Sequence, residues 1–230
     1  MTNPHKGHRE RMRKRYLASG FEDYEDHEIL EMILYYCYRQ VDTNPIAHKL
    51  LDTFGSLSAI FDAPVDTIKS VGVSENVAVF LKMIPDLARV YMDDKHNNRD
   101  KIITSDNVGE YFLHKFIGRQ EENLILLLLD KKGTELYCGV VASGNVTASE
   151  VPFRKIIDLS LRYNAANVYI AHNHPSGVAL PSLADVAVTN DLHRTLSFVG
   201  VALRDHYIIA DGEFCSLKDS TLCDCYDEQY

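Results

Sequence analysis

The sequence predicts an α/β domain, with a mixed sheet flanked by helices, preceded by a small all-α domain. Before residue 92, apolar residues recur at helical spacing. The run 124–129 is apolar on both faces, as in a central strand that is covered on both sides. After it, short strands alternate with single helices and several are joined by hairpin turns, which predicts a mixed sheet with helices against its faces.

The first part of the chain contains only predicted helices. They cover 7–18, 24–38, a segment opened by Pro45, 57–61 and 75–92. The stretch 68–74 resembles a helix-hairpin-helix turn, whose backbone N–H groups meet a phosphate at a helix start. Serine tolerates left-handed backbone poorly, so Ser74, in place of the second glycine of that motif, leaves phosphate binding open. The alternative is a helical bundle that packs or docks partners.

A polar stretch separates the two predicted domains. Residues 93–100 are polar throughout and read as a linker, which divides the chain into domains at 1–96 and 97–220. The acidic tail 221–230 is expected to be disordered. Its Cys223 and Cys225 provide two thiolates, which do not complete a metal site by themselves.

The second domain is predicted to alternate helices and strands. Asp130 to Gly133 form a hairpin-like turn between its first two strands, and Asp211-Gly212 form another near the end. The expected helices cover 107–116, 151–163 and 183–196, and the expected strands cover 124–129, 135–141, 167–171, 199–203, 207–210 and 213–216.

Composition limits the possible functions. The chain has 230 residues, no apolar run near the ~18 that a membrane helix needs, and a basic N-terminus without an apolar signal region, so we expect a cytoplasmic location and no membrane. A net charge of −9 argues against general nucleic-acid affinity. A basic cluster near the start could contact DNA, but we favour a solvated helix face offset by the acidic residues after it. The cluster contains Lys6, Arg9, Arg11, Arg13, Lys14 and Arg15.

A candidate metal site follows the strand at 167–171. Residues two apart on a strand share a face, so His172 and His174 project side by side from its end. Ser182 and Asp185 resemble a capping box that starts a helix, with Asp185 able to point back toward the imidazoles. Two neutral imidazoles and one carboxylate suit a catalytic zinc, which keeps a fourth position for water and lowers the pKa of that water to about 7. The alternative is a helix cap beside a turn histidine.

These residues resemble a known motif. His172-x-His174, seven residues, then Ser182-x-x-Asp185 resembles the JAMM motif of JAB/MPN metalloproteases, and the longer string from His172 to Gly177 is similar to the RadC branch, once called DNA repair proteins. The resemblance covers nearly the whole chain. It implies a JAB/MPN-like fold, similar in architecture to cytidine deaminases, one Zn²⁺ per chain, and hydrolysis of a peptide or isopeptide bond.

The resemblance also suggests two residues for the chemistry. Zinc hydrolysis needs a group that takes a proton from water and gives it to the leaving amine. The family has its catalytic Glu just before such a strand, which corresponds to Glu122; Glu121, which would face the other way, is the alternative. The motif serine, Ser182, is implied to steady the oxyanion, or it is only an N-cap.

Three further residues resemble positions of the RadC family, but the sequence does not assign them a definite role. Asp205 and His206 fit the RadC pattern, and His206 is expected to be either a partner of a metal-binding histidine or, as we favour, a satisfied structural histidine. Arg154 matches a family arginine for which we derive no role.

Other functions remain as alternatives to the hydrolase. The second hypothesis is a DNA-associated repair or recombination accessory that binds through residues 1–96, with a structural or residual metal site. A nucleobase deaminase is set aside because the chain has no Cys-x-x-Cys. A metal-dependent nuclease would require a two-metal, carboxylate-rich geometry, and the sequence contains only one cluster.

Overall fold

The computed structural model describes residues 7–96, 102–144, 151–175, 177–220 and 222. The chain forms two compact units, Met1–Leu87 and Ala88–Tyr230, and we describe each by itself. The division falls inside a helix, several residues before the boundary expected from the polar stretch. The predicted tail, with Cys223 and Cys225, lies outside the described residues apart from Leu222.

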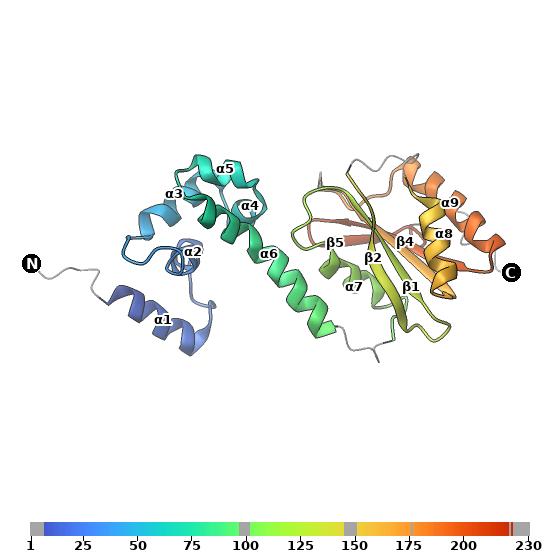
Figure 1. Cartoon of the computed structure of the whole chain (residues 1–230), viewed down its shortest axis with the longest axis horizontal. Coiled ribbons are helices and arrows are strands. Elements are labelled where there is room, and N and C mark those ends of the chain that lie inside the picture. The colour runs from blue at the N-terminus through green and yellow to red at the C-terminus, as the bar shows by residue number, and fades with distance from the viewer. Residues whose placement is uncertain (1–6, 97–101, 145–150, 176, 221, 223–230) are drawn as a thin grey trace, which may run out of the picture. The chain divides into compact units, whose positions relative to one another are not determined.

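The first unit is helical, as predicted (Figure 1). The helix expected at 24–38 is shorter because it ends at Leu34, and the last helix continues to His96, so residues 93–96 of the expected linker are helical. Residues 97–100 of that linker lie outside the described part. The helices are α1 (His8–Ser19), α2 (Asp26–Leu34), α3 (Asn44–Phe54), α4 (Leu57–Asp62), α5 (Val65–Ser70) and α6 (Glu75–His96).

The core of this unit explains where its helices begin and end. The helices bury one continuous set of apolar side chains, contributed by α2 to α6, which stabilises them by removing apolar surface from water. Gly55 ends α3 with a left-handed backbone, and Ser56 then caps α4 by accepting a hydrogen bond from the N–H of Ala59. The fully buried members include Leu30, Leu34, Leu50, Ile60, Ile68 and Leu81.

The turn before α6 differs from the helix-hairpin-helix pattern at its serine. Gly72 has a positive φ of 100°, whereas Ser74 does not take a left-handed backbone. Instead, the hydroxyl of Ser74 accepts a hydrogen bond from the N–H of Val77 at 3.4 Å. Ser74 therefore caps the helix, and the left-handed strain expected at this position does not arise.

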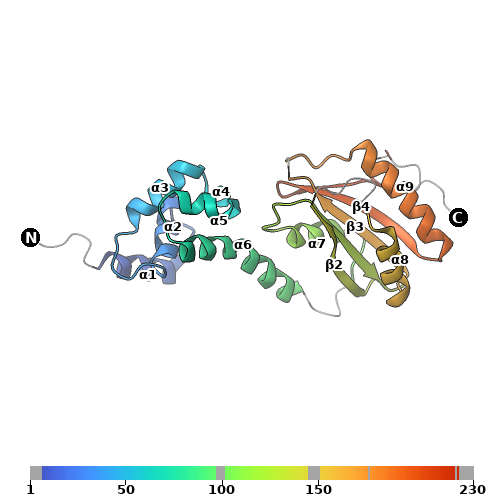
Figure 2. The same cartoon turned by 45° about the horizontal axis from the view of Figure 1, so that its top comes forward.

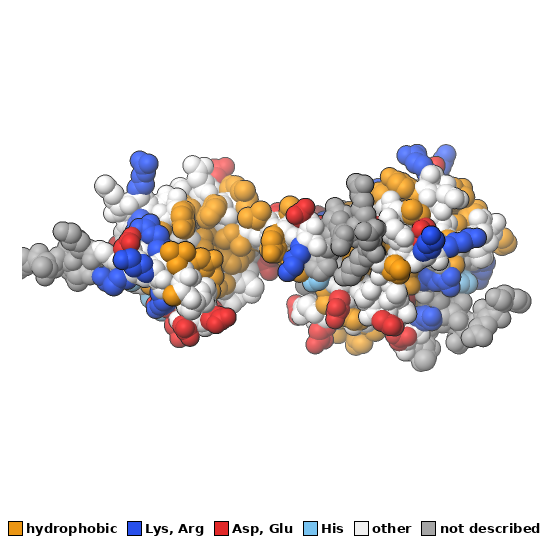
Figure 3. All heavy atoms as spheres, turned by 90° about the horizontal axis from the view of Figure 1, so that it is seen from below, with side chains coloured by type: hydrophobic (Ala, Val, Ile, Leu, Met, Phe, Trp, Pro, Cys, Tyr) orange, Lys and Arg blue, Asp and Glu red, His pale blue; other side chains and the backbone are white. Residues whose placement is uncertain are grey.

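The basic residues of the N-terminal helix have partners within the first unit. The guanidinium of Arg9 donates to the carbonyl oxygens of Tyr38, Arg39 and Val41. That of Arg15 pairs with the carboxylate of Glu28. Figure 3 shows blue and red side chains of this unit near one another, among exposed hydrophobic ones. These contacts agree with the interpretation of a charge-balanced helix face.

The second unit is a mixed five-stranded sheet with helices against it, which confirms the predicted class. Its strand order is β2-β1-β3-β4-β5; β3 and β4 are parallel and the other neighbours are antiparallel. None of the described helices is long and apolar enough to cross a membrane. The elements are α7 (Val108–Lys115), β1 (Asn123–Leu129), β2 (Glu135–Ser143), α8 (Phe153–Arg162), β3 (Asn167–Asn173), α9 (Leu183–Phe198), β4 (Ala202–Ala210) and β5 (Glu213–Ser216).

The prediction of two separate strands near the end of the second unit was wrong. The two strands expected at 199–203 and 207–210 form the single strand β4. The polar residues Asp205 and His206 continue the strand because both find buried hydrogen-bond partners elsewhere in the fold. A buried polar group with such partners does not interrupt a sheet.

Helices cover both faces of the sheet, with α7 on one and α8 and α9 on the other (Figures 1 and 2), and each face has its own core. Because side chains alternate along a strand, Leu124, Leu126 and Leu128 of β1 pack toward α8 and α9, whereas the residues between them pack toward α7. Ile170 of β3 belongs to the α9 side. His172, two residues later, therefore faces the same side, at the end of the sheet where α9 begins.

Two hairpin glycines provide a test of the sheet. Both Gly133 and Gly212 have positive φ, but only at Gly133 would a Cβ meet backbone, at 2.6 Å from the carbonyl oxygen of Ile103. We expect Gly212→Ala to lower the free energy of unfolding by about 1–2 kcal/mol through the backbone alone. Gly133→Ala should cost ~1–3 kcal/mol more because of the overlap. Urea unfolding of the two variants would measure the difference, and equal costs would contradict it.

Candidate metal centre

The end of β3 brings two imidazoles together. His172 is buried, and His174 follows the last strand residue, so the rings come from the same face of the strand. Their Nε2 atoms lie 2.9 Å apart. Between them, Asn173 faces the other way: its Oδ1 accepts from the N–H of Asn123 at 2.8 Å, and its amide donates to the carbonyl of Glu121. This pairing, which sequence reasoning missed, fastens the histidine-bearing strand end to the start of β1.

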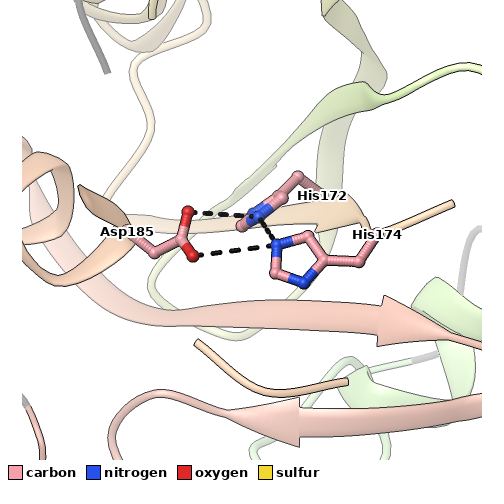
Figure 4. Close-up of side chains that lie close together, drawn as sticks. All are labelled: His172, His174 and Asp185. Atoms are coloured by element: carbon pink, nitrogen blue, oxygen red, sulfur yellow. Dashed lines mark hydrogen bonds and ion pairs between the residues drawn. The ribbon is translucent and has the colours of Figure 1, made fainter. Parts of the chain in front are cut away.

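The start of α9 brings the carboxylate. As predicted, Ser182 and Asp185 form a capping box: the Ser182 hydroxyl accepts from the Asp185 N–H at 3.2 Å, and Asp185 Oδ2 accepts from the Ser182 N–H at 2.7 Å. Asp185 also points back at the histidines (Figure 4). Its Oδ1 is 3.2 Å from His172 Nε2, and its Oδ2 is 3.7 Å from His174 Nε2.

These donor atoms form a group that could hold a metal ion. One ligand atom from each of His172, His174 and Asp185 lies within 4.8 Å of the others. In the described part of the chain, no other group of three or more His, Cys, Asp or Glu residues has this arrangement. His174 Nδ1 faces the carbonyl oxygen of Val178 at 3.1 Å. Since a carbonyl only accepts, neutral His174 carries its proton on Nδ1 and points the lone pair of Nε2 at the group. That donor set fits a divalent cation such as zinc.

Neighbouring groups shift the pKa of the Asp185 carboxyl group. Burial acts to raise the pKa of Asp185, but His172, when it is protonated and its Nε2–H faces the carboxylate, and then the hydroxyl and N–H of Ser182 lower that pKa below its ordinary value. Asp185 is therefore ionised at neutral pH. A carboxylate beside two imidazoles would supply negative charge to a bound cation.

A cavity of about 300 Å³ opens beside the three residues, and its lining also includes Glu122, Leu124 and Val151. Leu124 pairs with His172 in the antiparallel register of β1 and β3. Glu122 directly precedes β1, and His174 directly follows β3, and both line this cavity. Glu121, one residue earlier, lies in a bend before the strand, is exposed, and is not among the residues that line the cavity. The structure thus brings Glu122 to the cavity, together with Ser182.

The three other residues that match the RadC pattern, Asp205, His206 and Arg154, lie in different parts of the second unit. His206 is fully buried, and its Nε2 is 2.7 Å from Nδ1 of His172, so it directly contacts a candidate ligand. Burial lowers the pKa of His206, which keeps its ring neutral. Asp205 points away, accepting from Ser216 Oγ at 2.5 Å and from the Lys218 N–H at 3.0 Å. Arg154 is exposed in the first turn of α8.

Together, the mixed sheet and the His-x-His and Ser-x-x-Asp residues at its edge are consistent with a JAB/MPN-like domain. Residues 102–222 match the family described as the RadC-like JAB domain. The chain belongs to this RadC family.

Relatives match over most of the chain. A UPF0758 protein of Fusobacterium nucleatum is 30% identical over 224 residues, which cover 94% of this chain and 97% of the relative. A UPF0758 protein of Chromobacterium violaceum is 34% identical over 205 residues, covering 88% and 91%. The similarity therefore includes the helical unit as well as the metal-site unit.

Proposed function

We propose that this protein is a zinc-dependent metallohydrolase that cleaves a peptide or isopeptide bond in a peptide or protein substrate. The observation that carries the proposal is the convergence of His172, His174 and Asp185 beside a cavity that holds a further carboxylate. These three residues would hold the ion. A bound zinc would supply a Lewis acid that makes water nucleophilic at neutral pH.

Glu122 is the proposed general base and general acid. Its carboxylate would take a proton from the attacking water as the water oxygen bonds to the substrate carbonyl carbon, and would return it to the leaving nitrogen as the C–N bond breaks. Its support is its place in the lining of the cavity that also contains His172 and His174.

Ser182 is the proposed oxyanion donor. In the structure its hydroxyl donates to Asp185 Oδ2 at 2.6 Å, so its proton would have to turn from this carboxylate toward the substrate. We expect Ser182→Ala to lower kcat about 10²–10³-fold and to cost about 1 kcal/mol of stability through the lost cap.

A matched control separates the two effects of losing Ser182. Ser56 caps α4 in the helical unit, so Ser56→Ala should lower stability by a similar amount and leave kcat unchanged. The measurements are kcat and thermal unfolding of both variants. An unchanged kcat in Ser182→Ala would leave Ser182 with a capping role alone.

The direct test of the proposed function combines metal analysis with a cleavage screen. The purified full chain is expected to contain about one zinc per chain and to cleave members of a peptide library. Activity should disappear on treatment with a chelator and return with added zinc. A zinc-loaded protein that cleaves nothing, in a library of both peptide and isopeptide substrates, would count against the hydrolase.

The alternative, a DNA-associated accessory, has less support. The arginines Arg9 and Arg15 of the basic cluster are engaged with carbonyls and a carboxylate, and Ser74 caps a helix. A protein that neutralises phosphates should show DNA affinity that falls steeply as salt rises. Salt-dependent binding by the full chain, absent after deletion of residues 1–96, would revive this alternative.

A further inference from the structure

A chain of hydrogen bonds runs behind the candidate metal centre and connects β3, β4 and α9. His172 Nδ1 lies 2.7 Å from His206 Nε2, and His206 Nδ1 lies 2.7 Å from the hydroxyl of Thr189. That hydroxyl also lies 2.6 Å from the backbone carbonyl oxygen of Asp185, one helical turn earlier. The side chains of His172, His206 and Thr189 are all buried, so water does not compete for these bonds.

The donor and acceptor of each hydrogen bond in this series follow from the backbone carbonyl of Asp185. The oxygen of Asp185 can only accept, so the single proton of the Thr189 hydroxyl is donated to it. Thr189 can then only accept from His206, which places the His206 proton on Nδ1. His206 Nε2 is left with a lone pair, so it must accept the proton of His172 Nδ1. The Nε2 of neutral His172 therefore carries no proton and faces Asp185 and His174.

We propose that Thr189 and His206 are positioning residues, which fix His172 in the tautomer that a metal ion requires. A neutral imidazole can carry its proton on either nitrogen, and only one choice leaves Nε2 free to bind. The series of hydrogen bonds ends at the backbone carbonyl of Asp185, whose side chain supplies the carboxylate. It therefore couples the orientation of His172 on β3 to α9, the helix that carries Asp185. This inference rests on the proposed metal site and is independent of hydrolysis.

The local sequence makes the arrangement possible. Thr189 lies four residues after Asp185, so its side chain stands over the carbonyl of the preceding turn, a bond that helical threonines commonly make. His206 reaches the same point from β4 because Ile170 pairs with His206 and His172 with Ile208 in the parallel register. The three elements meet only in the folded chain.

The first test needs no variant and no metal. Nitrogen-15 NMR of the metal-free full chain at mildly alkaline pH reports which imidazole nitrogen carries the proton. We expect the proton on Nδ1 in both His172 and His206. A proton on Nε2 of either residue would overturn the assignment.

The second test uses zinc affinity, measured by competition with a chelator. Thr189→Val keeps the shape of the side chain but removes the hydroxyl, and we expect zinc binding to weaken about 10–100-fold, as when outer partners of metal-binding histidines are lost. Thr189→Ser restores the hydroxyl and should restore both the affinity and the Nδ1–H form of His206. The serine rescue separates hydrogen bonding from packing.

The outcomes distinguish this inference from the function on which it rests. If the wild-type protein binds zinc and Thr189→Val binds it equally well, the positioning role is wrong. If the wild-type protein binds no zinc, the metal proposal fails, and the NMR measurement still decides whether the chain of hydrogen bonds sets the tautomer of His172.

Discussion

Replacing His174 with alanine is expected to reduce the zinc content from about one ion per chain to nearly none. His174 supplies one of the three protein donors, and its Nδ1 is held by the carbonyl of Val178, so Nε2 is aimed at the group. Catalytic zinc sites have three protein ligands, so two donors and water would hold the ion poorly. The affinity should fall by more than the roughly 100-fold that the loss of an outer hydrogen-bond partner causes.

The measurement is elemental analysis of the purified protein, with chelator competition for affinity. His193→Ala is the matched control, because His193 lies on α9, the helix of Asp185, but outside the candidate metal group. It should keep a full complement of zinc. A His174→Ala protein that retains zinc as tightly as the control would remove the basis of the metal centre.

Replacing Glu122 with glutamine is expected to keep the zinc and the fold but to lower kcat by about 10²–10⁴-fold. The amide has nearly the same shape as the carboxylate and cannot take up a proton from water at neutral pH. Glu122 is half-buried beside the cavity, and none of the three metal-site donors comes from it. The effect should therefore appear in kcat, with zinc content and thermal unfolding unchanged.

The neighbouring residue provides the control for this prediction. Glu121 is exposed and is not among the residues that line the cavity, so Glu121→Gln should turn over substrate as the wild type does. Both variants carry the same change in charge, so a general electrostatic effect would appear in both. If Glu121→Gln loses activity and Glu122→Gln does not, the assignment of the base moves by one residue.

Zinc content and turnover in these variants separate the candidate functions. A structural metal site would lose zinc in His174→Ala and show no cleavage in any protein, including the wild type. A hydrolase would lose cleavage in both His174→Ala and Glu122→Gln, but lose zinc only in the first. This pattern requires a peptide that the wild-type protein cleaves, which the library screen is designed to find.

Much of the site was predictable because it depends on short-range geometry. Alternation along a strand sets His172 and His174 on one face, and a capping box needs only the three-residue spacing of Ser182 and Asp185. The apolar run 124–129 predicts a strand covered on both sides. In the structure, all seven residues of the corresponding strand β1 are buried. The RadC pattern then pointed to the same residues.

Other features depend on contacts between distant segments. The sequence favoured a structural role for His206, because nothing local indicates that its ring meets His172 across a parallel strand pair. The same contacts explain why β4 continues through Asp205 and His206, where two separate strands were predicted. Asn173 likewise has its partners 50 or more residues away, at the start of β1.

The identity of the three donors, the helix start that carries Asp185 and the class of the fold follow from residue types and their spacing along the chain. The position of Glu122 in the cavity lining, and the hydrogen bonds from Asp185 through Thr189 to His206 and His172, depend on how strands and helices pack. Spacing along a chain defines periodicity within an element, whereas register and packing define which elements face one another.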